Sequence, residues 1–214
     1  MINFKKNRLI LIVAGALWLL IIGTGTGLLW RYESRPGATV AAPARWPADS
    51  RLRRAAARAT LVMSAHPHCP CTRASIGELS RLMTQAQGRL TAYVLFVKPS
   101  DFPEGWEETS LMTSAAAIPG VTVVADDGGV EADRFHAATS GQTVLYDAEG
   151  KRLFSGGMTS GRGHEGDNAG RTAIVSLLTK DEAGQEETPV FGCPLFARTE
   201  CLTGKEVGHE KDNN

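Results

Sequence analysis

The sequence has no excess of either charge, because 23 basic side chains match 23 acidic ones. Three of the basic residues lie within the first thirty positions, which leaves 20 basic against 23 acidic side chains in the remainder. A protein that binds nucleic acid usually carries a basic surface. The charge balance therefore gives no reason to expect nucleic acid as a partner.

Cysteine is also scarce, with four residues in a chain of 214. This is too few for a small scaffold built on disulfides, and the repeated Cys-x2-Cys pairs of a structural zinc module are missing. No internal repeat is visible, and the glycine-rich stretch 155–168 lacks the Gly-Lys-Ser/Thr ending of a phosphate-binding loop. The cysteines are therefore predicted to be chemically active or locally structural.

One long apolar run is present at residues 9–30, LILIVAGALWLLIIGTGTGLLW. Twenty-two residues without a charge are enough, at a rise of about 1.5 Å each, to cross a hydrocarbon core of about 30 Å. A cleaved signal peptide has an apolar region of only about 7 to 15 residues that ends at a small-residue cleavage site. The run predicts an uncleaved transmembrane helix.

The orientation of this helix is not settled by charge, because basic residues lie on both sides of it. The very short segment 1–8 favours a cytoplasmic amino terminus, with the rest of the chain outside. An oxidising exterior also suits the cysteine chemistry. We therefore expect a single-pass protein of the cell inner membrane whose C-terminal domain is periplasmic.

The remaining chain is predicted to form one domain, at residues 51–180, because its length leaves no room for two. A linker at 31–50 precedes it, and its three prolines in RPGATVAAPARWPAD predict an extended spacer that lifts the domain off the bilayer. A tail at 181–214 follows. Two charged stretches of the tail flank an apolar part that holds two cysteines.

The hydrophobic pattern of the domain predicts alternating strands and helices. The order is strand, helix, strand, helix, strand, helix, hairpin and helix, at 60–65, 72–85, 90–97, 106–117, 121–125, 130–136, 143–147 with 152–156, and 167–179. Gly150 lies in the polar loop of the hairpin, where a turn needs positive φ. The fold class is therefore α/β, with a mixed sheet flanked by helices.

The chemistry is expected at His66-Pro67-His68-Cys69-Pro70-Cys71-Thr72-Arg73, between the first strand and the first long helix. A thiol at a helix start is stabilised as thiolate by the helix dipole and by unpaired backbone N–H groups, and the thiolate is the nucleophile. A protonated His68 and Arg73 would act in the same direction. Pro70 suits the first helical position, where its missing N–H costs nothing.

This pattern resembles the thioredoxin superfamily, in particular the membrane-anchored TlpA-like reductases and the peroxiredoxin-related proteins. Their sequence has Trp-Cys-Pro-x-Cys-Arg after a strand, then a helix, and later a hairpin with Asp-x-x-Gly, here Asp147 to Gly150. The resemblance implies that Cys69 is the attacking cysteine. Cys71 then occupies a spacer position, and Thr72 stands where the family has its resolving cysteine. The whole pattern also resembles the bacterial membrane proteins known as RedB.

The resemblance further places Gly141 where the family has a cis-proline that faces the active site. Ser140 and Gly141 are expected to expose backbone groups to a substrate strand. A cis bond without proline is costly, so a trans peptide is expected.

Three arrangements of the cysteines are open. A disulfide between Cys69 and Cys71 would close a small strained ring and be strongly oxidising. Alternatively, Cys69 is resolved by Cys193 or Cys201 from the tail. Finally, Cys193 and Cys201 could pair with each other and fix the tail.

The glycine-rich loop 155–168 is expected at the sheet end remote from Cys69 and Cys71, unless it folds back. Arg162 and His164 could then line a separate pocket or anion site. The alternative is a polar loop with an exposed histidine.

The predicted function is thiol-disulfide exchange with protein thiols or disulfides, without a cofactor. The alternative is copper binding by His66, His68, Cys69, Cys71 and His164, since copper favours thiolate and imidazole. It would resemble the Sco-type assembly factors, although these have a Cys-x3-Cys spacing. Peroxide reduction through a sulfenic acid is a third possibility, but the threonine expected upstream is missing. A non-catalytic binding module is the fourth.

Overall fold

Five strands form one sheet in the order β3-β2-β1-β4-β5 in a computed structural model that describes residues 3–86, 88–179 and 185–196. The strands are β1 Ala59–Ala65, β2 Leu90–Lys98, β3 Val121–Asp127, β4 Thr143–Tyr146 and β5 Arg152–Gly156. β1, β2 and β3 run parallel, whereas β4 is antiparallel to both β1 and β5. The predicted mixed sheet and antiparallel hairpin are confirmed, and Gly150 has φ +82° in the turn.

Four helices accompany the sheet: α2 Pro70–Ala86, α3 Ser110–Ala116, α4 Val130–Arg134 and α5 Ala169–Thr179. Apolar side chains of α2, α3 and α5 share one core with β1 and β2. Every residue of β1 is buried, as expected for a central strand covered on both faces. Leu61 and Met63 belong to this core, whereas Val62 belongs to the core on the opposite face.

The opposite face is covered by the segment that was predicted as a spacer. Trp46 packs edge-on against Phe135 at 5.1 Å and against Tyr146 at 5.3 Å. Ala42 is buried, and the Tyr146 hydroxyl donates a hydrogen bond to the Pro43 carbonyl at 3.1 Å. The prediction that this segment lifts the domain away was wrong, because its apolar residues complete a core.

All nine predicted strands and helices of the domain are present, with one clear difference in bounds. The helix expected from Trp106 begins at Ser110 instead, after Thr109, whose backbone is extended at φ −120°. Residues 103–108 form turns, with hydrogen bonds from Trp106 N to Pro103 O and from Glu108 N to Gly105 O. The Trp106 ring is thereby free to pack elsewhere.

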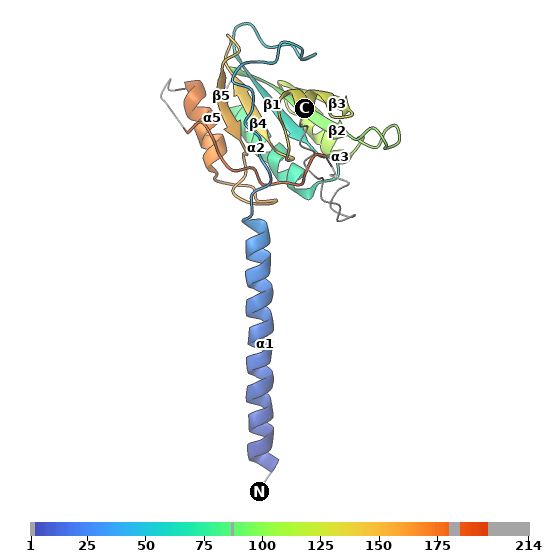
Figure 1. The fold of residues 1–214 in the computed structure, drawn as a ribbon. Coiled ribbons are helices and arrows are strands. Elements are labelled where there is room, and N and C mark those ends of the chain that lie inside the picture. Colours follow the sequence, from blue (N-terminus) through green and yellow to red (C-terminus); the bar gives the residue numbers. More distant parts are fainter. Residues whose placement is uncertain (1–2, 87, 180–184, 197–214) are drawn as a thin grey trace, which may run out of the picture.

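The remaining helix, α1 Asn3–Glu33, projects from the domain as an isolated rod (Figure 1). In the described part of the chain, residues Asn7–Glu33 form one helix that is long and apolar enough to cross a membrane, and its most apolar 18 residues have a mean hydropathy of 2.3. Its large apolar side chains are exposed. Because the domain does not cover them, only an apolar environment such as a bilayer would bury them.

Candidate functional site

Cys69 lies at the junction of β1 and α2, where the sequence predicted it. Pro70 is the first residue of α2, and Cys69 O accepts a hydrogen bond from Thr72 N at 3.0 Å. Cys69 N in turn donates to His66 O at 3.2 Å. The sulfur therefore sits at the amino end of a 17-residue helix, where the helix dipole favours thiolate.

Thr72 is part of the framework of the site. Its hydroxyl donates to His66 O at 2.9 Å and lies 2.8 Å from the Ser140 hydroxyl. Ser140 Oγ also accepts a hydrogen bond from His66 N at 2.9 Å. These bonds tie the start of α2 to the loop before β4.

Gly141 continues the same loop, with φ +87° and a hydrogen bond from its N–H to Ser64 O at 2.7 Å. A Cβ at this position would lie 2.8 Å from the Ser75 hydroxyl. Glycine is therefore favoured here both by the positive φ and by the lack of space for a side chain. Its peptide bond is trans, as predicted, like the others in the described ranges.

A second sulfur reaches Cys69 from the C-terminal segment, which we define as residues 185–196. Cys193 Sγ lies 2.9 Å from Cys69 Sγ. Cys71 is adjacent, and all three thiols are free among the described cysteines. We call Cys69, Cys71 and Cys193 the three-cysteine site. Cys201 lies outside the described residues, so its predicted pairing with Cys193 stays a prediction.

The three thiols differ in acidity. Burial acts to raise the pKa of Cys69, but hydrogen bonds from the Cys193 thiol and from three backbone N–H groups outweigh it and lower the pKa below its ordinary value. Burial, then the charge of Cys69, raises the pKa of Cys71. Burial and the hydrogen bond to Cys69 raise the pKa of Cys193 to about 12. A single thiolate on Cys69 is therefore the favoured charge state.

The cation that acts on this site is Arg162. Its guanidinium donates to Gly192 O and opposes the raised pKa values of Cys71 and Cys193. β5 ends at Gly156, which pairs with Thr143 near the end of β1, so the glycine-rich loop begins at the same sheet end as the cysteines. The expectation that it lies at the remote end, with a separate pocket for Arg162, was wrong. Arg73 and His68 are exposed and are not among the causes that shift the pKa of Cys69.

The loop also joins the site to the last turn of α1. Arg162 N donates to Glu33 O at 3.2 Å, and its guanidinium lies 5.1 Å from the Tyr32 ring centre. His164 Nε2 lies 3.4 Å from a Glu33 carboxylate oxygen. The three-cysteine site therefore lies at the end of the domain that meets the apolar helix.

Two histidines and a tryptophan form an aromatic cluster before Cys69. The His68 and Trp106 rings are 4.6 Å apart and those of His66 and Trp106 are 5.4 Å apart. His66 Nδ1 accepts a hydrogen bond from His68 N at 3.2 Å. Burial, and then the charge of His68, lowers the pKa of His66. Sequence reasoning missed Trp106, because it was placed within a helix.

The residues of the copper alternative do not converge. His68 Nε2 lies 2.9 Å from Trp106 O, whereas His164 faces Glu33. Within the described ranges, no group of three or more His, Cys, Asp or Glu side chains is arranged to hold a metal ion.

The backbone that was expected to be open at Ser140 is covered by the C-terminal segment. Ser140 N donates to Cys193 O at 2.8 Å, and Leu195 N donates to Ala138 O at 3.0 Å. Thr139 and Pro194 form an antiparallel bridge between these two bonds. The prediction of exposed groups was wrong, because a strand-like piece of the same chain occupies them.

Neither a protein-family model nor a curated protein matches this sequence. Solved structures do match: a hypothetical protein from Sinorhizobium meliloti has 20% identity and a TM-score of 0.59, covering 75% of this chain and 96% of that one. An uncharacterized conserved protein from Geobacillus kaustophilus has 19% identity and a TM-score of 0.55, covering 76% and 92%. A secreted disulfide oxidoreductase from Mycobacterium tuberculosis matches at 19% identity and a TM-score of 0.37, covering 45% and 66%.

The likeness to the first two structures bears on the fold alone, and the strand order describes that fold. Two parallel crossovers lead from β1 to β3, and an antiparallel hairpin then adds β4 and β5 beside β1. This strand arrangement is a thioredoxin-like fold. In this thioredoxin-like domain the cysteines lie after β1, as the sequence predicted, and the loop before β4 faces them.

Proposed function

We propose that this chain is a membrane-anchored thiol-disulfide oxidoreductase in which Cys69 is the attacking thiolate. One observation carries the proposal: Cys69 lies at the start of α2, and the sulfur of Cys193 lies 2.9 Å from its own. The pKa of Cys69 is lowered there, while the pKa values of its two neighbouring thiols are raised. A thiolate next to protonated thiols is what exchange requires, because the thiolate attacks and a second thiol resolves.

The reaction has two steps that balance. The Cys69 thiolate attacks one sulfur of a substrate disulfide, that S–S bond breaks, and the other substrate sulfur leaves as a thiolate. A second thiol of the chain then loses its proton to solvent and attacks Cys69 in the mixed disulfide. An intramolecular disulfide forms, and the two electrons pass to the released substrate thiolates, which take up protons. A protein dithiol outside the chain would restore the reduced form.

The contacts between α1 and the domain support the view that α1 is kept as a membrane anchor and is not cleaved. Arg162 contacts both Glu33 and Tyr32, so cleavage before the domain would remove contacts that place this arginine at the three-cysteine site. We propose a single pass of the inner membrane with the domain in the periplasm, where disulfides persist. Because the site lies at the anchored end, its substrates are protein disulfides within reach of the bilayer surface. The likeness to the RedB group stays a prediction.

The test uses the full-length chain, reduced and held in detergent micelles. Mixing with 5,5′-dithiobis(2-nitrobenzoate) reports each attack by the colour of the released thiolate. We expect a fast phase that Cys69→Ser abolishes and Cys71→Ser retains. A fast phase that survives Cys69→Ser would contradict the assignment of the nucleophile.

A further inference from the structure

The attacking sulfur is covered. Cys69 is only 2% exposed and Cys71 8% exposed, so no protein disulfide can meet Cys69 unless part of the site moves. The group that lies against Cys69 Sγ is Cys193 Sγ, on the C-terminal segment. Removal of the C-terminal segment would therefore uncover this side of Cys69 Sγ.

The C-terminal segment is held in the manner of a bound strand. Its backbone pairs with the loop before β4 through the Ser140–Cys193 and Leu195–Ala138 hydrogen bonds. A Cβ at Gly192 would lie 2.0 Å from Ser140 O, so the two backbones can approach this closely only because residue 192 is glycine. The pairing therefore depends on main-chain groups that an extended substrate also possesses.

We propose that residues 192–195 occupy the position of a substrate strand, and that Cys193 rather than Cys71 resolves the mixed disulfide on Cys69. This inference rests on the proposed function and deepens it. The substrate is an extended protein segment that carries a disulfide and displaces residues 192–195. The segment then returns and delivers Cys193.

The sulfur geometry supports this order of events. The two sulfurs are 2.9 Å apart, and a disulfide bond is about 2.05 Å long, so bond formation needs a movement of less than about an ångström. In contrast, Cys71 is fixed within α2, and its carbonyl accepts a hydrogen bond from the Ser75 hydroxyl at 3.3 Å. A sulfur on a segment that can leave and return suits a resolving thiol better than one built into the helix.

The acidity of Cys193 changes in the direction that the second step requires. Besides burial, its pKa is raised by the hydrogen bond to Cys69 and by the charge of that thiolate. Both causes vanish once Cys69 is part of a mixed disulfide, while the Arg162 guanidinium continues to lower the pKa. The chain thus keeps Cys193 protonated before the attack and favours its ionisation afterwards.

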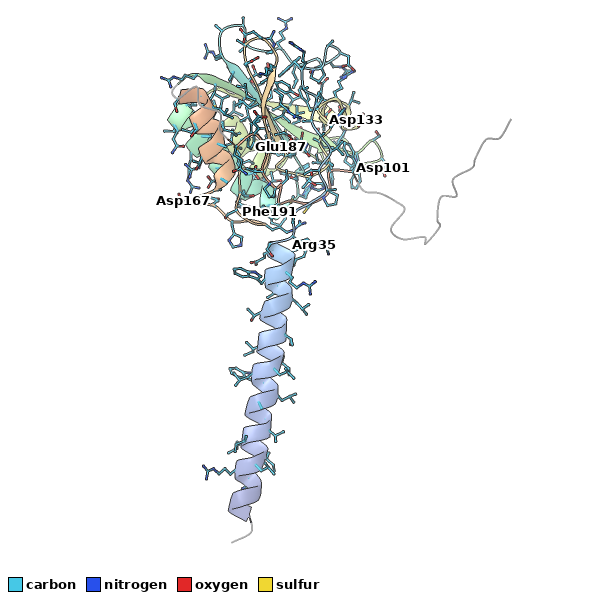
Figure 2. All side chains as sticks on the ribbon, turned by 60° about the vertical axis from the view of Figure 1, so that its left-hand side comes forward. Arg35, Asp101, Asp133, Asp167, Glu187 and Phe191 are labelled. Atoms are coloured by element: carbon cyan, nitrogen blue, oxygen red, sulfur yellow. The ribbon has the colours of Figure 1, made fainter. Side chains whose placement is uncertain are left out.

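The segment is attached at two buried points, Val190 and Leu195, whereas Pro194 between them is exposed and Cys193 is half-buried. Val190 O accepts a hydrogen bond from Gly37 N at 2.8 Å, four residues after α1 ends at Glu33. Figure 2 shows Phe191 and Arg35 at this same end of the domain. Separation of residues 192–195 from the loop therefore requires Leu195 to leave its buried position, while Val190 stays docked.

The experiment maps the disulfide formed by the full-length chain in detergent after one equivalent of 5,5′-dithiobis(2-nitrobenzoate). Digestion without reduction and mass spectrometry identify the linked cysteines. We expect a Cys69–Cys193 link in the wild type and a loss of at least tenfold in its yield in Gly192→Ala. The control Phe196→Ala, at an exposed neighbouring position, should keep the link.

A kinetic arm uses the same probe. In Cys193→Ser the aryl adduct on Cys69 should persist at least ten times longer than in the wild type, whereas Cys71→Ser should release it at the wild-type rate. A Cys69–Cys71 or Cys193–Cys201 link, or an adduct that persists only in Cys71→Ser, would overturn this inference and leave Cys69 as the nucleophile. If Cys69 forms no adduct in any variant, the proposed function fails as well.

Discussion

Leu195 is the residue by which the access of substrate to Cys69 can be changed without touching a sulfur. It is 1% exposed and packs with Val97, Ala132 and Ala137 in a small cluster apart from the main core. Leu→Ala at a buried site costs about 2 to 5 kcal/mol. Because this cluster is formed between the C-terminal segment and the domain, the loss falls on docking of the segment rather than on the sheet.

The expected effect follows from the lower end of that range. A loss of about 2 kcal/mol raises the population of the undocked segment about 30-fold, since 1.4 kcal/mol corresponds to a factor of ten. Alkylation of Cys69 depends on this open population when the segment opens and closes faster than the reagent reacts. We therefore expect Leu195→Ala to accelerate alkylation of Cys69 about 30-fold or more.

The assay labels the full-length protein in detergent with iodoacetamide, quenches at timed intervals and quantifies the Cys69 peptide by mass spectrometry. Phe196→Ala, at a position that is 38% exposed, is the neighbouring control and should stay within twofold of the wild type. Ile174→Ala, in the buried face of α5, lowers global stability without undocking the segment and should leave alkylation unchanged.

Two results would refute this reasoning. If Leu195→Ala and the wild type label Cys69 at the same rate, the C-terminal segment does not control access to the site. If Ile174→Ala accelerates labelling as strongly as Leu195→Ala, global unfolding rather than local undocking exposes the sulfur.

Three further predictions concern charge. As the pH falls, alkylation of Cys69 should persist because its pKa is lowered, whereas alkylation of the other two described cysteines should be lost first because their pKa values are raised. A parallel loss of labelling at all three cysteines, followed by mass spectrometry, would argue against a distinct thiolate. Glu78 is fully buried and accepts hydrogen bonds from groups around the start of α5, so Glu78→Ala should cost about 3 to 5 kcal/mol in urea unfolding, and exposed Glu165→Ala less than about 1 kcal/mol. Arg162→Gln should slow the release of the second substrate thiol in stopped-flow measurements, because the guanidinium lowers the pKa of Cys193, whereas the exposed Arg73→Gln should not. Equal rates in the two variants would exclude a role for the Arg162 charge.

Several features were predictable because they depend on neighbours within a few residues. The continuous apolar residues of β1 and the helical spacing of Ile76, Leu79 and Leu82 predicted a strand followed by a helix. Pro70 suited the helix start, and the polar loop with Gly150 marked the hairpin. The start of α3 was missed because residues 103–108 form turns that the apolar pattern does not encode.

The sequence by itself determined the class of the fold, the apolar helix and the position of Cys69 at a helix start, because hydrophobic periodicity and local backbone preferences act over short distances. Only the tertiary structure decided what surrounds that sulfur. Cys193 is 124 positions away from Cys69, and the loop that carries Arg162 meets both the C-terminal segment and the last turn of α1. Contacts of this kind depend on the packing of whole surfaces. The spacing of residues along the chain therefore could not show whether Cys193 lies next to Cys69 or pairs with Cys201 to hold the tail.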